Sequence, residues 1–433
     1  MKNVFLLYIT LFLASCAVQK PENLIKNTEV ERLIRRLSAD DLQGREVFTP
    51  GIEKAASFIE DEFRQIGLQP LKGSNDFRQE FSKLSIKPAT LSVTVNGDIL
   101  DENQVMVVTD KAGINWTNES GVETQYIKPG ETFMSRYREI MRLDKPVVVF
   151  VDKQFLDAFN RVRNFFMGDR VLDEANDKTA AVFIIGTENP SSYQINFSNQ
   201  ILKAPLYNIA GIIPGKSKPN EFVIFSGHYD HLGIIDEVEG DSIANGADDD
   251  ASGITAVISL ARYYKKLNNN ARTLIFVAFT GEESGMLGSE HFSEKLNPEE
   301  ITAMFNIEMI GKESKFGKNS AFITGFDRSD FGEILQRNLK GTGFTFYADP
   351  YTEQQLFYRS DNATLAAQGV PAHTISTVQI DKDEYYHTVD DEFETLNVDN
   401  ITATIKAIAL SSRSIVAGAE TPARIPPLKP AEP

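Results

Sequence analysis

The sequence predicts an α/β fold, in which a mostly parallel sheet is covered by helices on both faces and a β-rich module is inserted. From residue 207 onward, short apolar runs alternate with segments of helical periodicity, a pattern typical of strand–helix–strand units. Residues 222–225 are all apolar, β-branched or aromatic, which indicates a strand buried on both faces. Between residues 81 and 202 the pattern changes to short alternating strands, such as residues 91–95, which indicates the inserted module.

The elements follow in order along the chain. Apolar residues recur at helical spacing between Pro50 and Gly67, where glycine favours the left-handed end of a helix. Asn96-Gly97 is a turn signal inside the module. The same patterns predict strands at residues 91–95, 147–151, 180–186, 207–213, 222–225, 273–279, 303–307 and 320–323, and helices at residues 52–66, 155–175, 254–267 and 331–339.

These elements divide the chain into five segments. Residues 1–16 are expected to be a signal peptide, and residues 17–80 a polar tether, up to about Thr28, followed by the N-terminal helices of the main domain. Residues 81–202 form the inserted module, and residues 203–420 form the rest of the main domain. The proline-rich residues 421–433 are expected to be a disordered tail.

Composition limits the classes of partner. The chain has 433 residues, of which 42% are hydrophobic, enough for a large core and for roughly two domains. Lysine and arginine total 44 against 61 for aspartate and glutamate, a net charge of −17. This balance argues against nucleic acid or an anionic membrane surface as a partner of the folded body.

The N-terminus predicts export. Lys2 precedes an apolar run over residues 4–14, which is too short for a spanning helix and typical of a signal peptide. The run ends in Leu13-Ala14-Ser15-Cys16, which resembles the bacterial lipobox, and Cys16 is the only cysteine. We therefore expect a protein anchored to a bacterial membrane by a lipid on Cys16, outside the cytoplasm, whose fold contains no disulfide.

Polar residues follow three of the predicted strands. His228 and Asp230 come directly after residues 222–225, so His228 could bind a metal while Asp230 accepts a hydrogen bond from the other ring nitrogen. Glu282 and Glu283 follow residues 273–279, where one carboxylate could be a ligand and its neighbour a general base. Glu308 follows residues 303–307, where a buried charge requires a partner. Loops at the carboxyl ends of parallel strands converge on one crevice, so these groups are expected to meet.

Two more segments add potential ligands. Asp248, Asp249 and Asp250 precede a predicted helix; capping explains one carboxylate there but not three adjacent ones, which favours a cation. His387 supplies a second histidine beside acidic residues. The other three histidines are assigned less specific roles: His291 is expected to be solvated and His373 to lie in a strand or core, while His231 could line the pocket or simply belong to a loop.

This set of ligands suits zinc or another divalent ion. Two imidazoles and several carboxylates, without a thiolate, match the donors that zinc accepts, and cobalt or manganese would also fit. One carboxylate shared between two ions would form a two-metal site that activates water and polarises a carbonyl. The predicted reaction is hydrolysis of an amide.

The five motifs together resemble those of the M28 family of zinc metallopeptidases. They are Gly227-His228-Tyr229-Asp230, residues 246–253, Gly281-Glu282-Glu283, residues 306–311 and His387-Thr388, in the family's order. The resemblance implies a phosphorylase/hydrolase-like fold with a pair of zinc ions, and a protease-associated type of insertion. It assigns Asp249 as the bridging ligand, His228 and Glu308 to one ion, Glu283 and His387 to the other, Glu282 as general base, and Asp230 as the partner of His228.

One position departs from the family pattern, and the function has alternatives. The family usually has aspartate where this chain has Glu308, and the extra methylene could alter the geometry or the preferred metal. The leading hypothesis is an aminopeptidase acting on peptides. A carboxypeptidase or a glutaminyl cyclase of the same fold remains open, as does a surface-binding lipoprotein without catalysis. The full set of five ligands argues against the cyclase, and Glu282, which no ligand role requires, argues against the binding protein.

Overall fold

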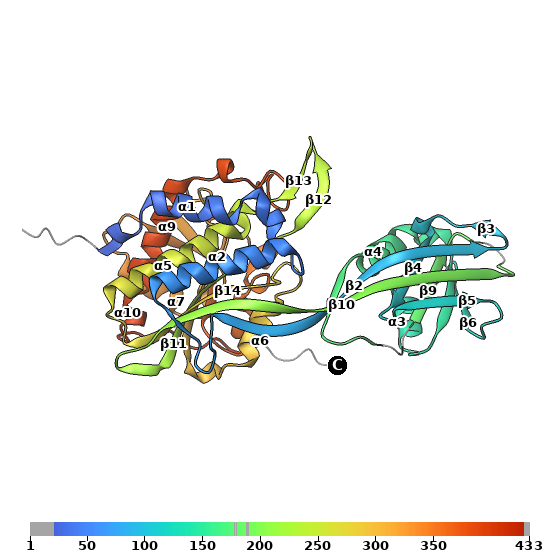
Figure 1. Cartoon of the computed structure of the whole chain (residues 1–433), viewed down its shortest axis with the longest axis horizontal. Helices are drawn as coiled ribbons and strands as arrows, with labels where there is room; N and C mark the ends of the chain where they lie inside the picture. Colours follow the sequence, from blue (N-terminus) through green and yellow to red (C-terminus); the bar gives the residue numbers. More distant parts are fainter. Residues whose placement is uncertain (1–20, 177, 179, 188–189, 428–433) are drawn as a thin grey trace, which may run out of the picture.

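The computed structural model describes residues 21–176, 178, 180–187 and 190–427. Its largest element is a twelve-stranded sheet that runs through the whole molecule (Figure 1). The main path of this sheet is β17 (Thr345–Ala348), β16 (Ser320–Ile323), β18 (Ala372–Ser376), β15 (Ile301–Ile307), β11 (Lys218–His228), β14 (Arg272–Phe279), β10 (Tyr193–Ile213), β2 (Arg78–Val95) and β3 (Asp98–Ile99). Three short strands pair beside this path: β1 (Gln69–Pro70), β5 (Gly113–Thr117) and β8 (Arg170–Leu172).

The centre of this sheet is parallel. Strand β11 lies between β14 and β15 and is parallel to both, and β18 continues the parallel set beyond β15. Phe225 of β11 stacks on Phe276 at 5.4 Å and on Phe305 at 4.9 Å, between ring centroids. The carboxyl ends of these strands therefore share one edge, as the alternation of strands and helices predicts.

Helices cover both faces of the sheet. One face packs under α1 (Asn27–Leu37), α2 (Pro50–Ile66), α5 (Gly253–Leu267), α7 (Phe331–Asn338) and α9 (Val398–Ser411), which share a large apolar core. The other face packs against α6 (Leu287–Glu294) and α8 (Asn362–Ala367). The short α10 (Arg413–Val416) follows α9, and β12 (Gly233–Val238) and β13 (Asp241–Ala244) form a separate hairpin.

A second, four-stranded sheet lies between β3 and β10 in the sequence. Its order is β4 (Val105–Thr109), β9 (Ala180–Ile185), β7 (Val147–Val151) and β6 (Glu123–Ile127). One face packs against the far ends of β2 and β10 together with β5, and the other against α3 (Phe133–Met141) and α4 (Leu156–Phe166). Strands β2 and β10 run unbroken from the main body into this part (Figure 1), so residues 81 and 202 both lie inside strands.

Three expectations from the sequence need correction. The helix expected at residues 155–175 ends at Phe166, because Arg170–Leu172 instead pairs with β2 as β8. The segment expected to be a polar tether ends near Thr28 as predicted, since α1 begins at Asn27, but residues 21–24 within it form a short 3-10 helix. Residues 421–427 pack against the body: Ile425 is buried, and its backbone N–H donates to the carbonyl of Gly369 at 3.1 Å.

The N-terminal segment is described only in part. The predicted signal peptide and Cys16 lie outside the described residues, as do residues 428–433. Within the described part of the chain, no helix combines the length and the apolar character needed to cross a membrane.

Candidate metal centre

His228 is the last residue of β11 and lies at the shared edge of the parallel strands. The apolar run before it buries the strand, and the imidazole itself is only 1% exposed. Its Nε2 lies 3.1 Å from Oδ1 of Asp249. Its Nδ1 lies 3.2 Å from the backbone carbonyl of Asp230 but 3.8 Å from the nearer carboxylate oxygen. The carbonyl of Asp230, rather than its carboxylate, is therefore the hydrogen-bond acceptor that orients the ring.

The Asp230 carboxylate holds the loop of the two glutamates. Its two oxygens accept the backbone N–H groups of Glu282 at 3.2 Å and Glu283 at 3.3 Å. This loop begins where β14 ends, so both glutamates lie beside His228. Asp230 thus acts on the pair by fixing the backbone from which their side chains project.

Three adjacent aspartates occupy an irregular helical turn, η5 (Ala247–Ser252), that leads into α5. Asp250 accepts backbone N–H groups from His228 at 3.1 Å, Gly253 at 3.0 Å and Met309 at 3.2 Å. Asp248 accepts the N–H of Gly311 at 2.7 Å. Two of the three carboxylates therefore stabilise loops, and only Asp249 faces the histidines.

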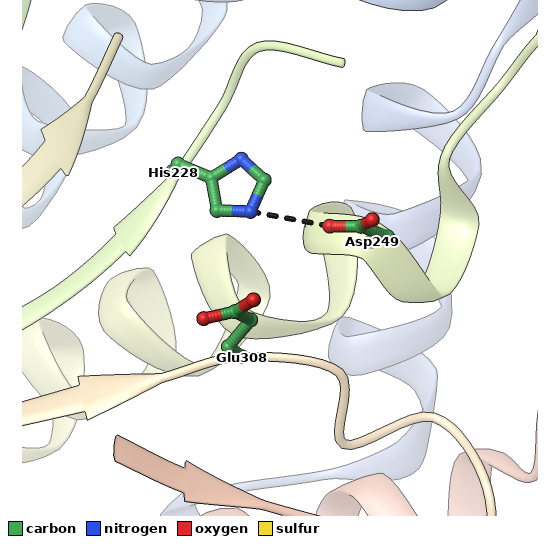
Figure 2. A group of neighbouring side chains, drawn as sticks. All are labelled: His228, Asp249 and Glu308. Carbon is green, nitrogen blue, oxygen red and sulfur yellow. Dashed lines mark ion pairs between the residues drawn. The ribbon is translucent and has the colours of Figure 1, made fainter. Parts of the chain in front are cut away.

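Glu308 follows β15 directly and points at the same place. Figure 2 shows the His228 ring and the Asp249 and Glu308 carboxylates turned toward a common space, from three different segments of the chain. The potential ligand atoms of these three residues all lie within 4.8 Å of one another.

A second group of potential ligands lies on the other side of Asp249. Nε2 of His387 is 3.3 Å from Oδ2 of Asp249 and 3.3 Å from Oε2 of Glu283. Nδ1 of His231 is 2.8 Å from Oε1 of Glu283. His387 reaches the site from a loop, with its ring stacked on Tyr386 at 3.8 Å.

The site concentrates negative charge away from water. Burial raises the pKa of both Glu308 and Asp361 to about 7. Burial and repulsion from Glu308 and Asp361 raise the pKa of Glu282 well above its usual value, although the charge of His228 opposes this. Burial also acts on Asp249, but the nearby imidazoles of His228 and His387 outweigh it and hold its pKa far below the usual range. So many buried carboxylates require a cation.

The residues present fit a metal ion. Among the buried polar atoms in the described part of the chain, Nε2 of His228, Nε2 of His387 and Oε2 of Glu308 have no hydrogen-bond partner, and all three belong to the groups around Asp249. Imidazole and carboxylate donors at these separations match the ligands of zinc. We infer that His228, Asp249 and Glu308 could hold one ion, and Asp249, Glu283 and His387 another.

The comparisons with known proteins agree with this chemistry. Residues 208–411 match peptidase family M28. This match places residues 208–411, just under half of the chain, in the M28 family. All five groups expected as ligands, and Glu282, fall within the matched residues of the M28 domain.

Relatives of the M28 domain carry related names. A protein of Trichophyton verrucosum named "Probable leucine aminopeptidase" is 28% identical over 203 residues, which are 45% of this chain and 53% of that protein. The chain thus spans about half the length of the curated relative, so the activity of the whole protein is taken up below as a proposal.

Two solved structures share the fold. The aminopeptidase from Aneurinibacillus sp. strain AM-1 aligns with a TM-score of 0.58 at 17% identity and covers 95% of this chain and 97% of its own. A zinc aminopeptidase from Bacillus subtilis aligns with a TM-score of 0.55 at 16% identity, covering 92% and 97%. At these identities the likeness establishes the fold of the M28 domain.

Sequence reasoning missed several residues that shape the site. The sequence leaves His231 between a pocket and a loop role, yet its ring is buried against Glu283. Arg45, also buried, donates to the carbonyls of Tyr229 at 2.8 Å and Gly246 at 3.0 Å, and so ties together the loops that carry His228 and Asp249. Only the position of His231, next to Asp230, was a visible signal, because the contacts of Arg45 join residues far apart in the sequence.

The remaining histidines lie away from the metal centre. His373 is fully buried in β18, as expected, with Nδ1 donating to the carbonyl of Thr324 at 2.9 Å. His291 is not simply solvated, since its ring stacks on Phe81 at 4.7 Å.

Proposed function

We propose that this chain is a two-zinc aminopeptidase that removes the first residue of peptides. The observation that carries the proposal is the position of Asp249. Its Oδ1 lies 3.1 Å from Nε2 of His228, and its Oδ2 lies 3.3 Å from Nε2 of His387. One carboxylate that offers a different oxygen to each of two histidines is the arrangement that a bridging ligand of two ions requires.

Glu282 is the group suited to move the proton. Two zinc ions, when bound, would acidify a water molecule and polarise the scissile carbonyl. Glu282 lies on the loop whose backbone N–H groups bind the Asp230 carboxylate, and it is not one of the residues assigned as metal ligands. Burial raises its pKa, which makes its carboxylate a stronger base, suited to accept a proton from the attacking water and return it to the leaving amine.

A pocket beside Glu308 fits the side chain of the first residue. It measures about 420 Å³, including the space open to solvent, and polar residues of its wall lie beside the apolar side chains of Met309, Phe322, Leu356, Val378 and Ile380. Such a wall favours an aliphatic or aromatic side chain. A preference of this kind agrees with the name of the leucine aminopeptidase relative.

The same features bear on the alternatives. A surface-binding lipoprotein without catalysis would have no use for Glu282. A carboxypeptidase of the same fold would share the pocket and the metal ligands, so only the choice of substrate separates it from an aminopeptidase. The five candidate ligands argue against a glutaminyl cyclase.

The location and the inserted module complete the proposal. The apolar run and Leu13-Ala14-Ser15-Cys16 support a lipid anchor at Cys16 and a place outside the cytoplasm. For residues 81–202, a sheet with helices on one face supports a protease-associated type of module. Labelling with palmitate should be lost in Cys16→Ala; labelling that persists would contradict the anchor.

Hydrolysis of a panel of free and N-acetylated aminoacyl amides tests the enzymatic proposal. The purified mature chain should cleave only substrates with a free amine, and a chelator should abolish cleavage. Glu282→Gln should lower kcat by about 10² to 10⁴ with the zinc content unchanged, whereas Glu294→Gln, an exposed change on α6, should behave as wild type. Cleavage of acetylated substrates, or full activity in Glu282→Gln, would overturn the proposal.

A further inference from the structure

We propose that His231 is an additional ligand of the second metal ion, binding through Nδ1 beside Glu283, His387 and Asp249. This inference rests on the two-metal site proposed above and adds to it a ligand that the resemblance to the family does not assign. With His231 as a ligand, the two ions would differ in their ligands, since the second would have two imidazoles and the first only one.

The distances support a common ion. The Nδ1 of His231 lies 2.8 Å from Oε1 of Glu283 and 3.8 Å from Oδ2 of Asp249. Nε2 of His387 lies 3.3 Å from the other oxygen of Glu283. An ion about 2.1 Å from each donor separates neighbouring donors by about 3.0 to 3.4 Å, and the observed separations bracket this range. Each oxygen of the Glu283 carboxylate therefore faces a different imidazole.

The fold holds the His231 ring in place. The side chain is fully buried, and a Cβ atom added at Gly246 would lie 2.6 Å from Cγ and Cδ2 of the ring, so the glycine backbone packs directly on it. The backbone N–H of His231 donates to the carbonyl of Arg45 at 3.3 Å. A ring fixed in this way needs no rearrangement to reach an ion.

The ligand sets imply different metal preferences. The first ion would have His228, Asp249 and Glu308, and the second would have His231, His387, Asp249 and Glu283. Imidazole donors favour zinc, nickel and copper, whereas carboxylates favour manganese and magnesium. We therefore expect the second ion to bind zinc more tightly, and the first to exchange for manganese more readily.

A simpler role has to be separated from ligation. A hydrogen bond from Nδ1–H of His231 to Glu283 would orient that carboxylate without any contact with metal. Asparagine can place an amide N–H near the position of Nδ1, so His231→Asn should retain such a hydrogen bond. His231→Ala removes both possibilities.

Two measurements test the proposal. The first is a zinc titration of the metal-free mature chain in competition with a chromophoric chelator, and the second is the absorption spectrum of the cobalt-substituted protein. The wild type should bind two ions. His231→Ala and His231→Asn should both lower the affinity for one ion by at least tenfold and leave the affinity for the other unchanged. Both variants should also alter the absorption spectrum of the cobalt-substituted protein. His291→Ala, a histidine outside the site, should match the wild type.

The outcomes distinguish this inference from the proposed function. If the wild type binds two ions and His231→Asn keeps both affinities and the spectrum, His231 only orients Glu283 and the inference is overturned. If the wild type binds fewer than two ions, the two-metal site fails and the inference fails with it.

Discussion

The carboxylate of Asp391 accepts a hydrogen bond from the backbone N–H of Asp249 at 3.0 Å. It also accepts the N–H of Asp248 at 3.0 Å, and its own carbonyl accepts the N–H of Ala247 at 2.9 Å. Asp391 lies on the same loop as His387. It therefore joins the segment that carries Asp249, the proposed bridging ligand, to the segment that carries His387, a proposed ligand of the second ion.

Replacing Asp391 by alanine should loosen both segments together. Two buried N–H groups would lose their acceptor, which costs about 3 kcal/mol of unfolding free energy. We expect zinc affinity to fall for both ions, because Asp249 serves both. Denaturant unfolding and zinc titration measure the two effects.

An asparagine at this position would keep one acceptor oxygen, so Asp391→Asn should give an intermediate loss. The exposed neighbour Asp390 provides the control, since Asp390→Asn should change neither quantity. An Asp391→Ala protein with wild-type zinc affinity would show that the turn is held by other contacts.

The sequence is most informative where ligands follow strands. His228, Glu283 and Glu308 lie at or just after the ends of β11, β14 and β15, and parallel strands bring their carboxyl ends to one edge whatever the details of packing. That rule brings distant residues together without any knowledge of the loops.

The residues that were missed depend on contacts that leave no local pattern. Asp391 and Arg45 act on backbone groups far away in the chain, so neither residue type nor spacing reveals them. Three adjacent aspartates predict a cation, yet only Asp249 faces the potential ligands, because Asp248 and Asp250 bind backbone N–H groups. The pairing of β2 with β10 is equally non-local, since its register links residues about a hundred positions apart.

Glu308 should make binding of the first ion depend on pH. Burial raises its pKa to about 7 in the metal-free chain, so below that pH a metal must displace a proton from it. The affinity for one ion should fall about tenfold per pH unit below pH 7. Zinc titrations at pH 6 and pH 8 measure this dependence.

Glu308→Ala separates the contribution of this carboxylate. The variant should bind one zinc instead of two and lose activity, because His228 and Asp249 alone leave the first ion with two protein ligands. Two bound equivalents in Glu308→Ala, with activity retained, would remove Glu308 from the ligand set.

His373 should make stability fall in mild acid. Burial lowers its pKa to about 4, whereas an unfolded histidine titrates near pH 6.5. Between these two values the unfolded chain binds a proton that the folded chain does not. His373 therefore makes its full contribution to the free energy of unfolding above pH 6.5. This contribution declines as the pH falls to 4, by about 3 kcal/mol in total.

Urea unfolding of the chelator-treated protein at pH 7.5 and pH 5 tests this contribution. His373→Asn should be less stable than the wild type at pH 7.5, because the ring also stacks on Phe331 at 4.8 Å. The difference between the two proteins should nevertheless shrink at pH 5. A difference that is the same at both pH values would mean that His373 is protonated in the folded state or does not titrate differently on unfolding.

Arg359 should exclude cationic side chains from the pocket beside Glu308. It is exposed, it lines this pocket, and its guanidinium makes no hydrogen bond or ion pair with another described residue. A lysine side chain entering the apolar pocket would approach this unneutralised charge. At a separation of about 6 Å and an effective dielectric constant of about 40, the repulsion is about 1.4 kcal/mol, or tenfold in rate.

Arg359→Gln should therefore raise kcat/KM for lysyl amides by about tenfold. The kcat/KM for leucyl amides should stay within twofold of the wild-type value, because only the lysyl substrate carries a charge into the pocket. Arg328→Gln, an exposed arginine outside this pocket, should change neither value. Steady-state kinetics on the two amides measure both ratios. Equal changes for the two substrates in Arg359→Gln would mean that Arg359 shapes the site without selecting the charge of the first residue.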